Sequence, residues 1–183
     1  MNVDLIDSMG SDLTVVNAAR VSFNKTSSTL DDKDIKLINY LAKHNHWSPF
    51  SHCFVQFRVK APIFIARQLA KHQVGLSWNE VSRRYVDSEP EFYYPDKWRL
   101  KAENAKQGSS SETVSKEDAW CDMNNYQDSW DGPADSEPHK YYIKDLCEDA
   151  LHLYNSLLEH PGVAPEMARM VLPQNMYTEW YWS

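Results

Sequence analysis

The chain has 183 residues, of which 42% are hydrophobic and 13% aromatic, so it can bury a core and is not wholly disordered. Its 19 basic and 26 acidic residues give a net charge of −7, which argues against a general binder of nucleic acids or anionic membranes. The charge is uneven, because residues 56–85 contain six Lys/Arg and one acid, whereas residues 104–150 contain four Lys and eleven Asp/Glu. A basic segment in an acidic chain indicates a site for a small anion such as a phosphate ester.

Targeting and redox features of the sequence favour the cytoplasm. The start of the chain lacks the basic and apolar regions of a signal peptide, and no run of about 18 apolar residues could span a membrane. The three cysteines form no CxxC pair, so we expect reduced thiols. Neither a GxGxxG nor a P-loop occurs, which excludes the two common nucleotide-binding loops.

The N-terminal part of the chain predicts two strands and two helices. Residues 3–7 predict a short strand, and Ser11 predicts the N-cap of the helix that follows it. After a polar loop at 24–29, apolar residues at helical spacing predict a second helix that ends near 43–46. Alternation of apolar and polar residues over 52–60 predicts a half-buried strand.

Prolines mark the starts of two further helices. Pro62 suits a first helical position, and this helix is expected to run to about His72, followed by a polar loop over 73–82. Pro165 opens a short helix, expected over residues 166 to about 172, that Pro173 ends.

A long polar region separates these helices. Residues 86–140 are mostly polar and irregular, with exposed loops expected at 105–111 and 128–138. We expect an inserted polar loop over about 100–140 rather than a second domain. An amphipathic pattern then predicts a long helix over 143–157.

The aromatic run over 177–182 is unusual, because chain ends are mostly polar. Trp180, Tyr181 and Trp182 need a cover, which we expect to be either a partner subunit or further chain.

The strongest candidate for chemistry is the stretch from Arg67 to Tyr85. On the helix expected to run to about His72, Gln68, Lys71 and His72 share one face. Arginine forks and serine hydroxyls in the following loop suit a phosphate, and Asn, Gln and Glu side chains suit a base edge. The same pattern also describes a solvated helix end with surface charges, so the residues alone leave both interpretations open.

Three weaker clusters have simpler explanations. Glu166 and Arg169, at i and i+3, are more typical of a surface ion pair. The three histidines of residues 44–52 match no zinc spacing, so a loop histidine that contacts a ligand is favoured over a metal site. Ser82 and Cys53 lack the sequence context of a catalytic nucleophile.

Several motifs, in the same order along the chain, resemble the flavin-dependent thymidylate synthases. The family signature is Arg-His-Arg, a spacer, then Ser-x-Arg with Asn-Glu just before the serine, and the stretch from Arg67 to Tyr85 is similar to it. The resemblance covers most of residues 1–100 and 141–182. Other similar segments are residues 18–22, 44–50, 60–68 and 166–173, with Tyr177-Thr178 behind the last of them.

The resemblance implies an α+β fold, a single domain over residues 1–183 with a central, mainly antiparallel sheet flanked by helices. It implies a homotetramer with active sites between subunits. The implied enzyme uses FAD to pass a methylene group from methylenetetrahydrofolate, with a hydride, to C5 of dUMP, and NADPH reduces the flavin. Its partners would be dUMP and folate, with no nucleic acid polymer and no membrane.

The resemblance also implies roles for individual residues. The expected dUMP-binding residues are Gln68, Glu80, Ser82, Arg83 and Arg84, with Arg169 from another subunit. Among these, the residues expected to act in catalysis are Ser82, Arg169 and Glu80. The expected FAD-binding residues are Ser22, His46, Ser48, Lys71, His72, Gln73, Val74 and Glu80. Glu166 is expected to orient Arg169, and no metal is implied.

Three departures from the family pattern affect these expectations. The family's Arg-His-Arg is Lys71-His72-Gln73 here, and the spacer to Ser82 is one residue longer. The family segment that brings further flavin and nucleotide contacts would follow Ser183, so we expect weak FAD binding. The alternatives are a related nucleotide-modifying variant, such as a hydroxymethylase, and an inactive, truncated remnant that binds nucleotide.

Overall fold

The computed structural model of the chain describes residues 1–86, 88–103, 108–113, 143–160 and 162–183. The loop expected at 128–138 lies outside these residues, as does much of the inserted polar region.

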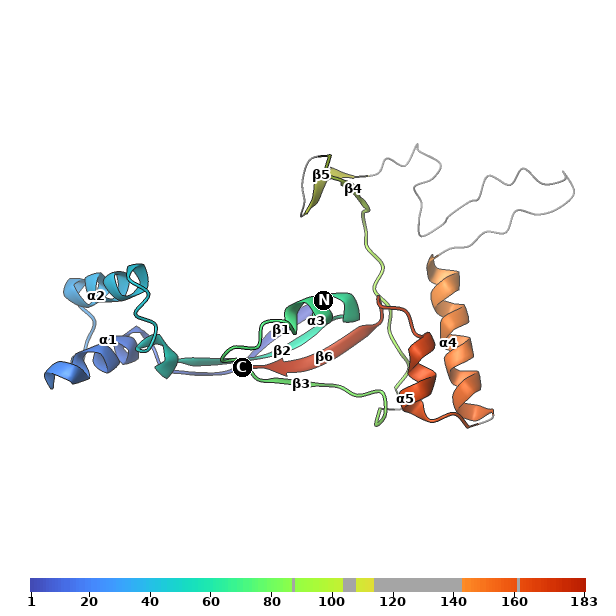
Figure 1. The fold of residues 1–183 in the computed structure, drawn as a ribbon, viewed down its shortest axis with the longest axis horizontal. Helices are drawn as coiled ribbons and strands as arrows, with labels where there is room; N and C mark the ends of the chain where they lie inside the picture. The colour runs from blue at the N-terminus through green and yellow to red at the C-terminus, as the bar shows by residue number, and fades with distance from the viewer. Residues whose placement is uncertain (87, 104–107, 114–142, 161) are drawn as a thin grey trace, which may run out of the picture. The chain divides into compact units, whose positions relative to one another are not determined.

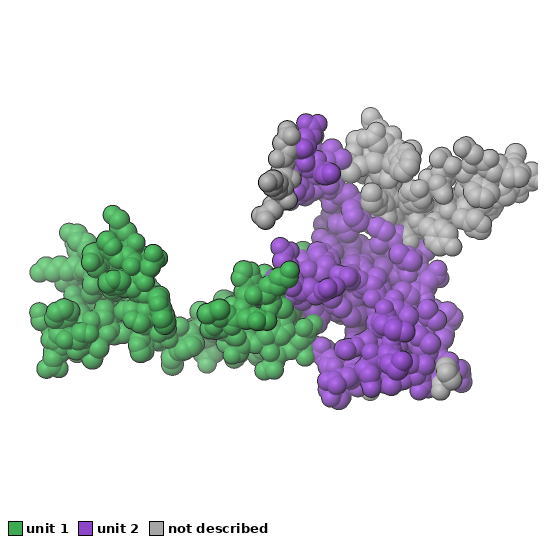
Figure 2. Space-filling view, viewed as in Figure 1, with its two compact units in different colours: residues 1–61, 69–80, 179–183 green, residues 62–68, 81–178 purple. Residues whose placement is uncertain are grey.

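The chain divides into two compact units (Figure 2). The first unit consists of residues 1–61, 69–80 and 179–183, and the second of residues 62–68 and 81–178. The single domain over 1–183 stays a prediction.

A four-stranded sheet is the central feature of the fold, with strand order β1-β2-β6-β3 (Figure 1). β1 pairs with β2, and β3 with β6, in antiparallel fashion. The predicted α+β class with a mainly antiparallel sheet is therefore confirmed. The strands are β1 (Asn2–Met9), β2 (Phe54–Pro62), β3 (Trp78–Glu80) and β6 (Tyr177–Trp182).

The predicted strand over 52–60 is β2, and only part of its apolar face is covered. Val59 and Ala61 are 6% and 4% exposed, whereas Val55 near the other end of the strand is 46% exposed. Its neighbour β1 is exposed along its whole length, including Val3 and Leu5.

A glycine makes the turn after β1. Gly10 has φ +92°, and a Cβ there would lie 2.7 Å from Cys53 Sγ. Both the backbone conformation and the close approach therefore require glycine.

The aromatic run at 177–182 forms β6, and a strand within the same chain covers part of it. Trp180 is 1% exposed and stacks on Trp78 of β3, with ring centroids 4.3 Å apart. The expectation that the cover had to come from a partner or from further chain is therefore wrong for Trp180. The polar loop predicted over 73–82 is also wrong at residues 78–80, which pair with 180–182.

Two helices of the first unit follow β1, and both begin at capped ends. The predicted N-cap at Ser11 is confirmed for α1 (Asp12–Arg20), where the Ser11 main-chain N–H donates to Thr14 Oγ1 at 3.1 Å. A 3-10 turn, η1 (Val21–Phe23), follows, and then α2 (Asp32–Lys43).

Asp31 caps α2 by accepting hydrogen bonds from the main-chain N–H groups of Lys33 and Asp34, at 2.8 and 2.9 Å. These bonds, that from Asp34 above all, lower the pKa of Asp31. A lowered folded pKa means that the cap stabilises the fold above the unfolded pKa, about 3.9. This stability is lost as the pH falls through the folded value.

Asp31→Asn is therefore expected to reduce the pH dependence of the unfolding midpoint below about pH 4, because asparagine caps without titrating. Thermal unfolding followed by circular dichroism across this pH range measures it. Asp32→Asn is the control, since Asp32 takes no part in these two bonds. Equal acid profiles for Asp31→Asn and the parent chain would contradict the role of the cap.

The second unit contains short helices and one long one. α3 (Ile63–Leu69) ends three residues before the expected His72. The long predicted helix is α4 (Ile143–Glu159), and α4 packs against α5 (Pro165–Ala168) and the 3-10 turn η3 (Arg169–Val171) (Figure 1). The single helix predicted over 166–172 is thus divided between α5 and η3.

Part of the region expected to be a loop is a hairpin. β4 (Arg99–Lys101) pairs with β5 (Ser109–Thr113), and Arg99 donates to the main-chain oxygens of Ser109 and Ser110 at 3.1 and 2.9 Å. The loop prediction at 105–111 is therefore wrong for its last residues.

Candidate functional site

A pocket of about 460 Å³ lies in the first unit, between α1, η1 and the segment that follows α2. Three residues expected to bind FAD line it together, namely Ser22, His46 and Ser48. Its volume is within the range of small-molecule sites in proteins. The other lining residues are Ala18, Ala19, Leu41, Asn45, Trp47 and Pro49.

The end of α2 determines where His46 lies. Asn45 has φ +57°, a left-handed conformation that turns the chain after the helix, and the His46 main-chain N–H donates to the Leu41 carbonyl at 2.9 Å. The His46 ring stands edge-on to Tyr40, with centroids 6.1 Å apart. Backbone and ring contacts therefore both hold this histidine in place.

The donors around the pocket suit a polar, aromatic ligand such as a flavin. Serine hydroxyls and an imidazole can hydrogen-bond the polar edges of a ring system, and Trp47, 73% exposed, offers a stacking surface. Sequence reasoning did not single out Trp47, Ala18 or Ala19. The small side chains at 18 and 19, beside a polar Ser22, were the available signal.

Residues 71–74 lie in the turn after α3 rather than on the helix. The His72 main-chain N–H donates to the Leu69 carbonyl at 2.9 Å. The expected shared face of Gln68, Lys71 and His72 is therefore wrong, because the helix ends at Leu69. All four turn residues are exposed, and Val74 is 99% exposed.

Glu80 occupies the last position of β3, where an aromatic neighbour holds its side chain. The Trp78 indole N–H donates to Glu80 Oε2 at 3.1 Å. Trp78 is itself stacked on the buried Trp180, so the group that donates to the carboxylate packs against a buried residue of the sheet.

Ser82, Arg83 and Arg84 lie close together in the second unit. Ser82 Oγ accepts a hydrogen bond from Arg84 Nε at 3.2 Å, which leaves the hydroxyl hydrogen for another acceptor. The Arg84 guanidinium lies 5.0 Å from the centre of the Tyr85 ring, and Arg83 donates to the Ser88 carbonyl. A guanidinium and a hydroxyl thus lie side by side, an arrangement that suits an anion.

Gln68 and Arg169 are the remaining expected dUMP-binding residues, and both belong to the second unit. Gln68 is exposed on α3, and Arg169 is exposed on η3. Arg169 Nε donates to the main-chain oxygen of Glu166 at 3.3 Å. Glu166 thus contacts Arg169 through its main-chain oxygen, and its role in orienting Arg169 stays a prediction.

Within the described ranges, every helix is too short or too polar to cross a membrane.

Comparison with known proteins identifies the family. The profile of the family described as "Thymidylate synthase complementing protein" matches residues 4–183, and the chain belongs to this family. Curated relatives carry the name flavin-dependent thymidylate synthase. The protein from Thermus thermophilus is 41% identical over 180 residues, and the one from Thermosipho africanus is 40% identical over 183.

A solved structure supports the same relationship. The UMP/dUMP methylase PolB from Streptomyces cacaoi, in its crystal structure with 5-Br UMP, is 33% identical with a TM-score of 0.68. The match covers 99% of this chain and 70% of PolB.

The chain is shorter than these relatives. The matches cover 98% of this chain but 58% of the Thermus protein and 69% of the Thermosipho protein. The family that the motifs indicated is confirmed, and the roles of the individual residues stay predictions.

Proposed function

We propose that the protein is a cytoplasmic flavin-dependent thymidylate synthase that converts dUMP to dTMP with methylenetetrahydrofolate and NADPH. The observation that carries the proposal is the pocket in which Ser22, His46 and Ser48 meet. Family resemblance named these residues as flavin contacts, although more than twenty residues separate the first from the others. The names of the relatives support the same reaction.

FAD would bind the pocket through the two serine hydroxyls and the His46 imidazole. When bound, the flavin supplies the hydride chemistry that turns a methylene group into a methyl group. Lys71 would place a positive charge near the diphosphate of FAD. His72, Gln73 and Val74 would make further contacts with FAD. Two arginines of the family pattern are replaced at 71 and 73, so a guanidinium fork is lost at each position and weak binding is expected.

The nucleotide would be bound mainly by residues of the second unit. Arg84, with Ser82 beside it, would bind the phosphate, and Arg83, Gln68 and Arg169 would complete the contacts. For Glu80, the family resemblance implies contacts to dUMP and to the flavin. UMP is a second candidate substrate, because PolB is described as a UMP/dUMP methylase.

The proposal includes a homotetramer with active sites between subunits. Apolar side chains on β1, such as Val3, Leu5 and Met9, are 62%, 61% and 58% exposed, more than a soluble monomer usually leaves uncovered on one strand. Sedimentation at micromolar concentration is expected to show a species several times heavier than 21.3 kDa. A single species of 21.3 kDa would contradict the tetramer.

Ligand titration of the purified protein tests the proposed function. Flavin fluorescence measures FAD binding, and calorimetry compares dUMP with UMP. Loss of hydrogen isotope from C5 of dUMP, in the presence of the folate and NADPH, measures turnover. A folded protein that binds nucleotide but neither FAD nor folate would overturn the proposal and favour a nucleotide-binding remnant. A hydroxymethyl product would favour the variant enzyme.

A further inference from the structure

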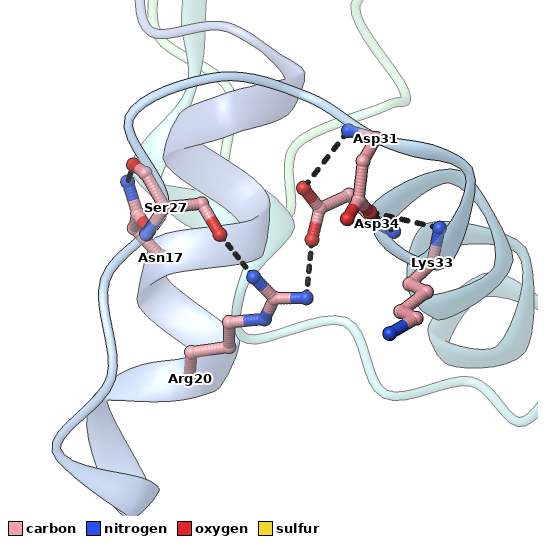
Figure 3. A network of polar contacts seen from close by, with 6 residues as sticks. All are labelled: Asn17, Arg20, Ser27, Asp31, Lys33 and Asp34. Atoms are coloured by element: carbon pink, nitrogen blue, oxygen red, sulfur yellow. Dashed lines mark hydrogen bonds and ion pairs between the residues drawn. The ribbon is translucent and has the colours of Figure 1, made fainter.

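An ion pair joins the two helices that carry the pocket (Figure 3). Arg20 is the last residue of α1, and its guanidinium contacts Asp34 Oδ1 in the first turn of α2. The Asp34 side chain is 1% exposed and that of Arg20 is 25% exposed. Burying a carboxylate is costly unless an opposite charge lies beside it, so the pairing strongly constrains where the two helices meet.

The same arginine also holds the loop between the helices. Its guanidinium donates to the Ser27 hydroxyl (Figure 3). The Asn17 side chain both accepts a hydrogen bond from the Ser27 main chain and donates one to it. The Ser27 N–H donates to Asn17 Oδ1 at 2.7 Å, and Asn17 Nδ2 donates to the Ser27 oxygen at 3.0 Å. The end of α1, the loop and the start of α2 therefore form one polar network.

Ser22 lies two residues after Arg20 in the sequence, in a segment that is exposed. It lies in η1, the three-residue turn that Arg20 precedes, and its neighbours Val21 and Phe23 are 70% and 75% exposed. The main-chain oxygen of Arg20 accepts from the Lys25 N–H at 3.3 Å, which closes this turn. The position of Ser22 thus depends on where Arg20 is held.

Each of the two helices that this ion pair joins contributes, with the segment that follows it, one wall of the pocket. Ala18, Ala19 and Ser22 come from α1 and η1, whereas Leu41 and residues 45–49 come from α2 and the segment after it. Arg20 and Asp34 are absent from the lining. The pair can therefore act on a bound ligand without touching it, by fixing one wall against the other.

We propose that Arg20 and Asp34 are positioning residues that hold Ser22 at the distance from His46 and Ser48 at which all three can contact one ligand. The inference rests on the proposed function in that the ligand of this pocket is FAD. Preorganising polar groups before the ligand arrives avoids the cost of ordering them on binding. Loosening the ion pair is therefore expected to weaken FAD binding without removing any group that touches FAD.

Three variants separate positioning from simple stabilisation of the fold. Arg20→Met leaves a buried charge unpaired, and is expected to lower both the melting temperature and FAD affinity, the latter about tenfold. Arg20→Met combined with Asp34→Asn removes both charges. It is expected to recover much of the melting temperature but little of the FAD affinity. Arg20→Lys keeps the charge without the fork and is expected to lie between the parent and Arg20→Met.

Arg58→Met is the matched control. Arg58 pairs with Glu179 in the same unit, with Nε 2.8 Å from Oε2, but the two side chains are 52% and 28% exposed and do not line the pocket. Its loss is expected to leave FAD affinity unchanged. Recovery of FAD affinity in parallel with the melting temperature in the double variant would overturn the positioning role.

Hydrogen exchange of the ligand-free protein gives a readout that needs no flavin. In the neutral double variant, faster exchange is expected at residues 21–29, with α1 and α2 still protected. Unchanged exchange there would contradict the inference. If the parent chain binds no FAD, the proposed function and the ligand part of the inference fail, and exchange at 21–29 still decides whether the ion pair orders this wall.

Discussion

Trp180→Ala is expected to lower the free energy of unfolding by about 3–5 kcal/mol, the usual cost of truncating a buried tryptophan. Trp180 is 1% exposed, its ring stacks on Trp78, and its strand pairs with β3. The substitution removes the contact surface between these two strands and leaves a cavity. Because a domain is typically stable by about 5–15 kcal/mol, this single change is expected to remove a large share of it. Urea unfolding at one fixed protein concentration measures the loss.

Two other variants show which property of the tryptophan matters. Tyr181→Ala changes the next residue of the same strand, which is 43% exposed, and is expected to cost much less. Trp180→Phe keeps an aromatic ring and removes an indole N–H that has no acceptor among the described residues. It is therefore expected to cost less than the alanine variant. Equal effects of Trp180→Ala and Tyr181→Ala would contradict the burial of this tryptophan as a source of stability.

β3 could not be predicted because the strand with which it pairs is distant in the sequence. Three residues are too few for a periodic pattern, and Trp78, Asn79 and Glu80 are typical of a polar loop with one aromatic residue. They form a strand because residues 180–182 pair with them about a hundred positions later. The unusual aromatic chain end was visible in the sequence, but its cover was not.

The elements that were predicted correctly have local causes. Ser11 and the residues after it contain the whole signal for the start of α1, and the alternation of β2 lies within nine residues. The end of α3 has no such signal, since no proline or glycine follows Leu69 until Gly75. The sequence therefore favoured a helix through His72. Because the helix ends at Leu69, residues 71–74 lie in a turn instead.

The candidate site was predicted residue by residue from family motifs rather than from geometry. The structure brings Ser22, His46 and Ser48 into one pocket, which no spacing rule could have shown. It also connects Glu80 to Trp78, and Arg84 to Ser82, through contacts between residues two positions apart. The Arg20–Asp34 ion pair was not foreseen, because a charged residue near a helix end is usually solvated.

Arg84→Ala is expected to weaken dUMP binding about thirtyfold or more, because a phosphate loses a charge-assisted, forked donor. The fold should be unaffected, since Arg84 is exposed and its side chain contacts Ser82 and Tyr85, which are its neighbours along the chain. These contacts matter for affinity because they hold the guanidinium in place before the nucleotide arrives. Calorimetric titration with dUMP measures the loss, and circular dichroism checks the fold.

Comparison with other arginines decides whether the effect is specific. Arg84→Lys keeps the charge but not the fork, so an intermediate affinity is expected. Arg99→Ala removes an exposed arginine of the same unit, and is expected to leave dUMP affinity unchanged because Arg99 binds the main chain of its own hairpin. If Arg84→Ala binds dUMP as tightly as Arg99→Ala does, the phosphate is bound elsewhere. The stretch around Arg84 would then be the solvated surface turn that its sequence equally allows.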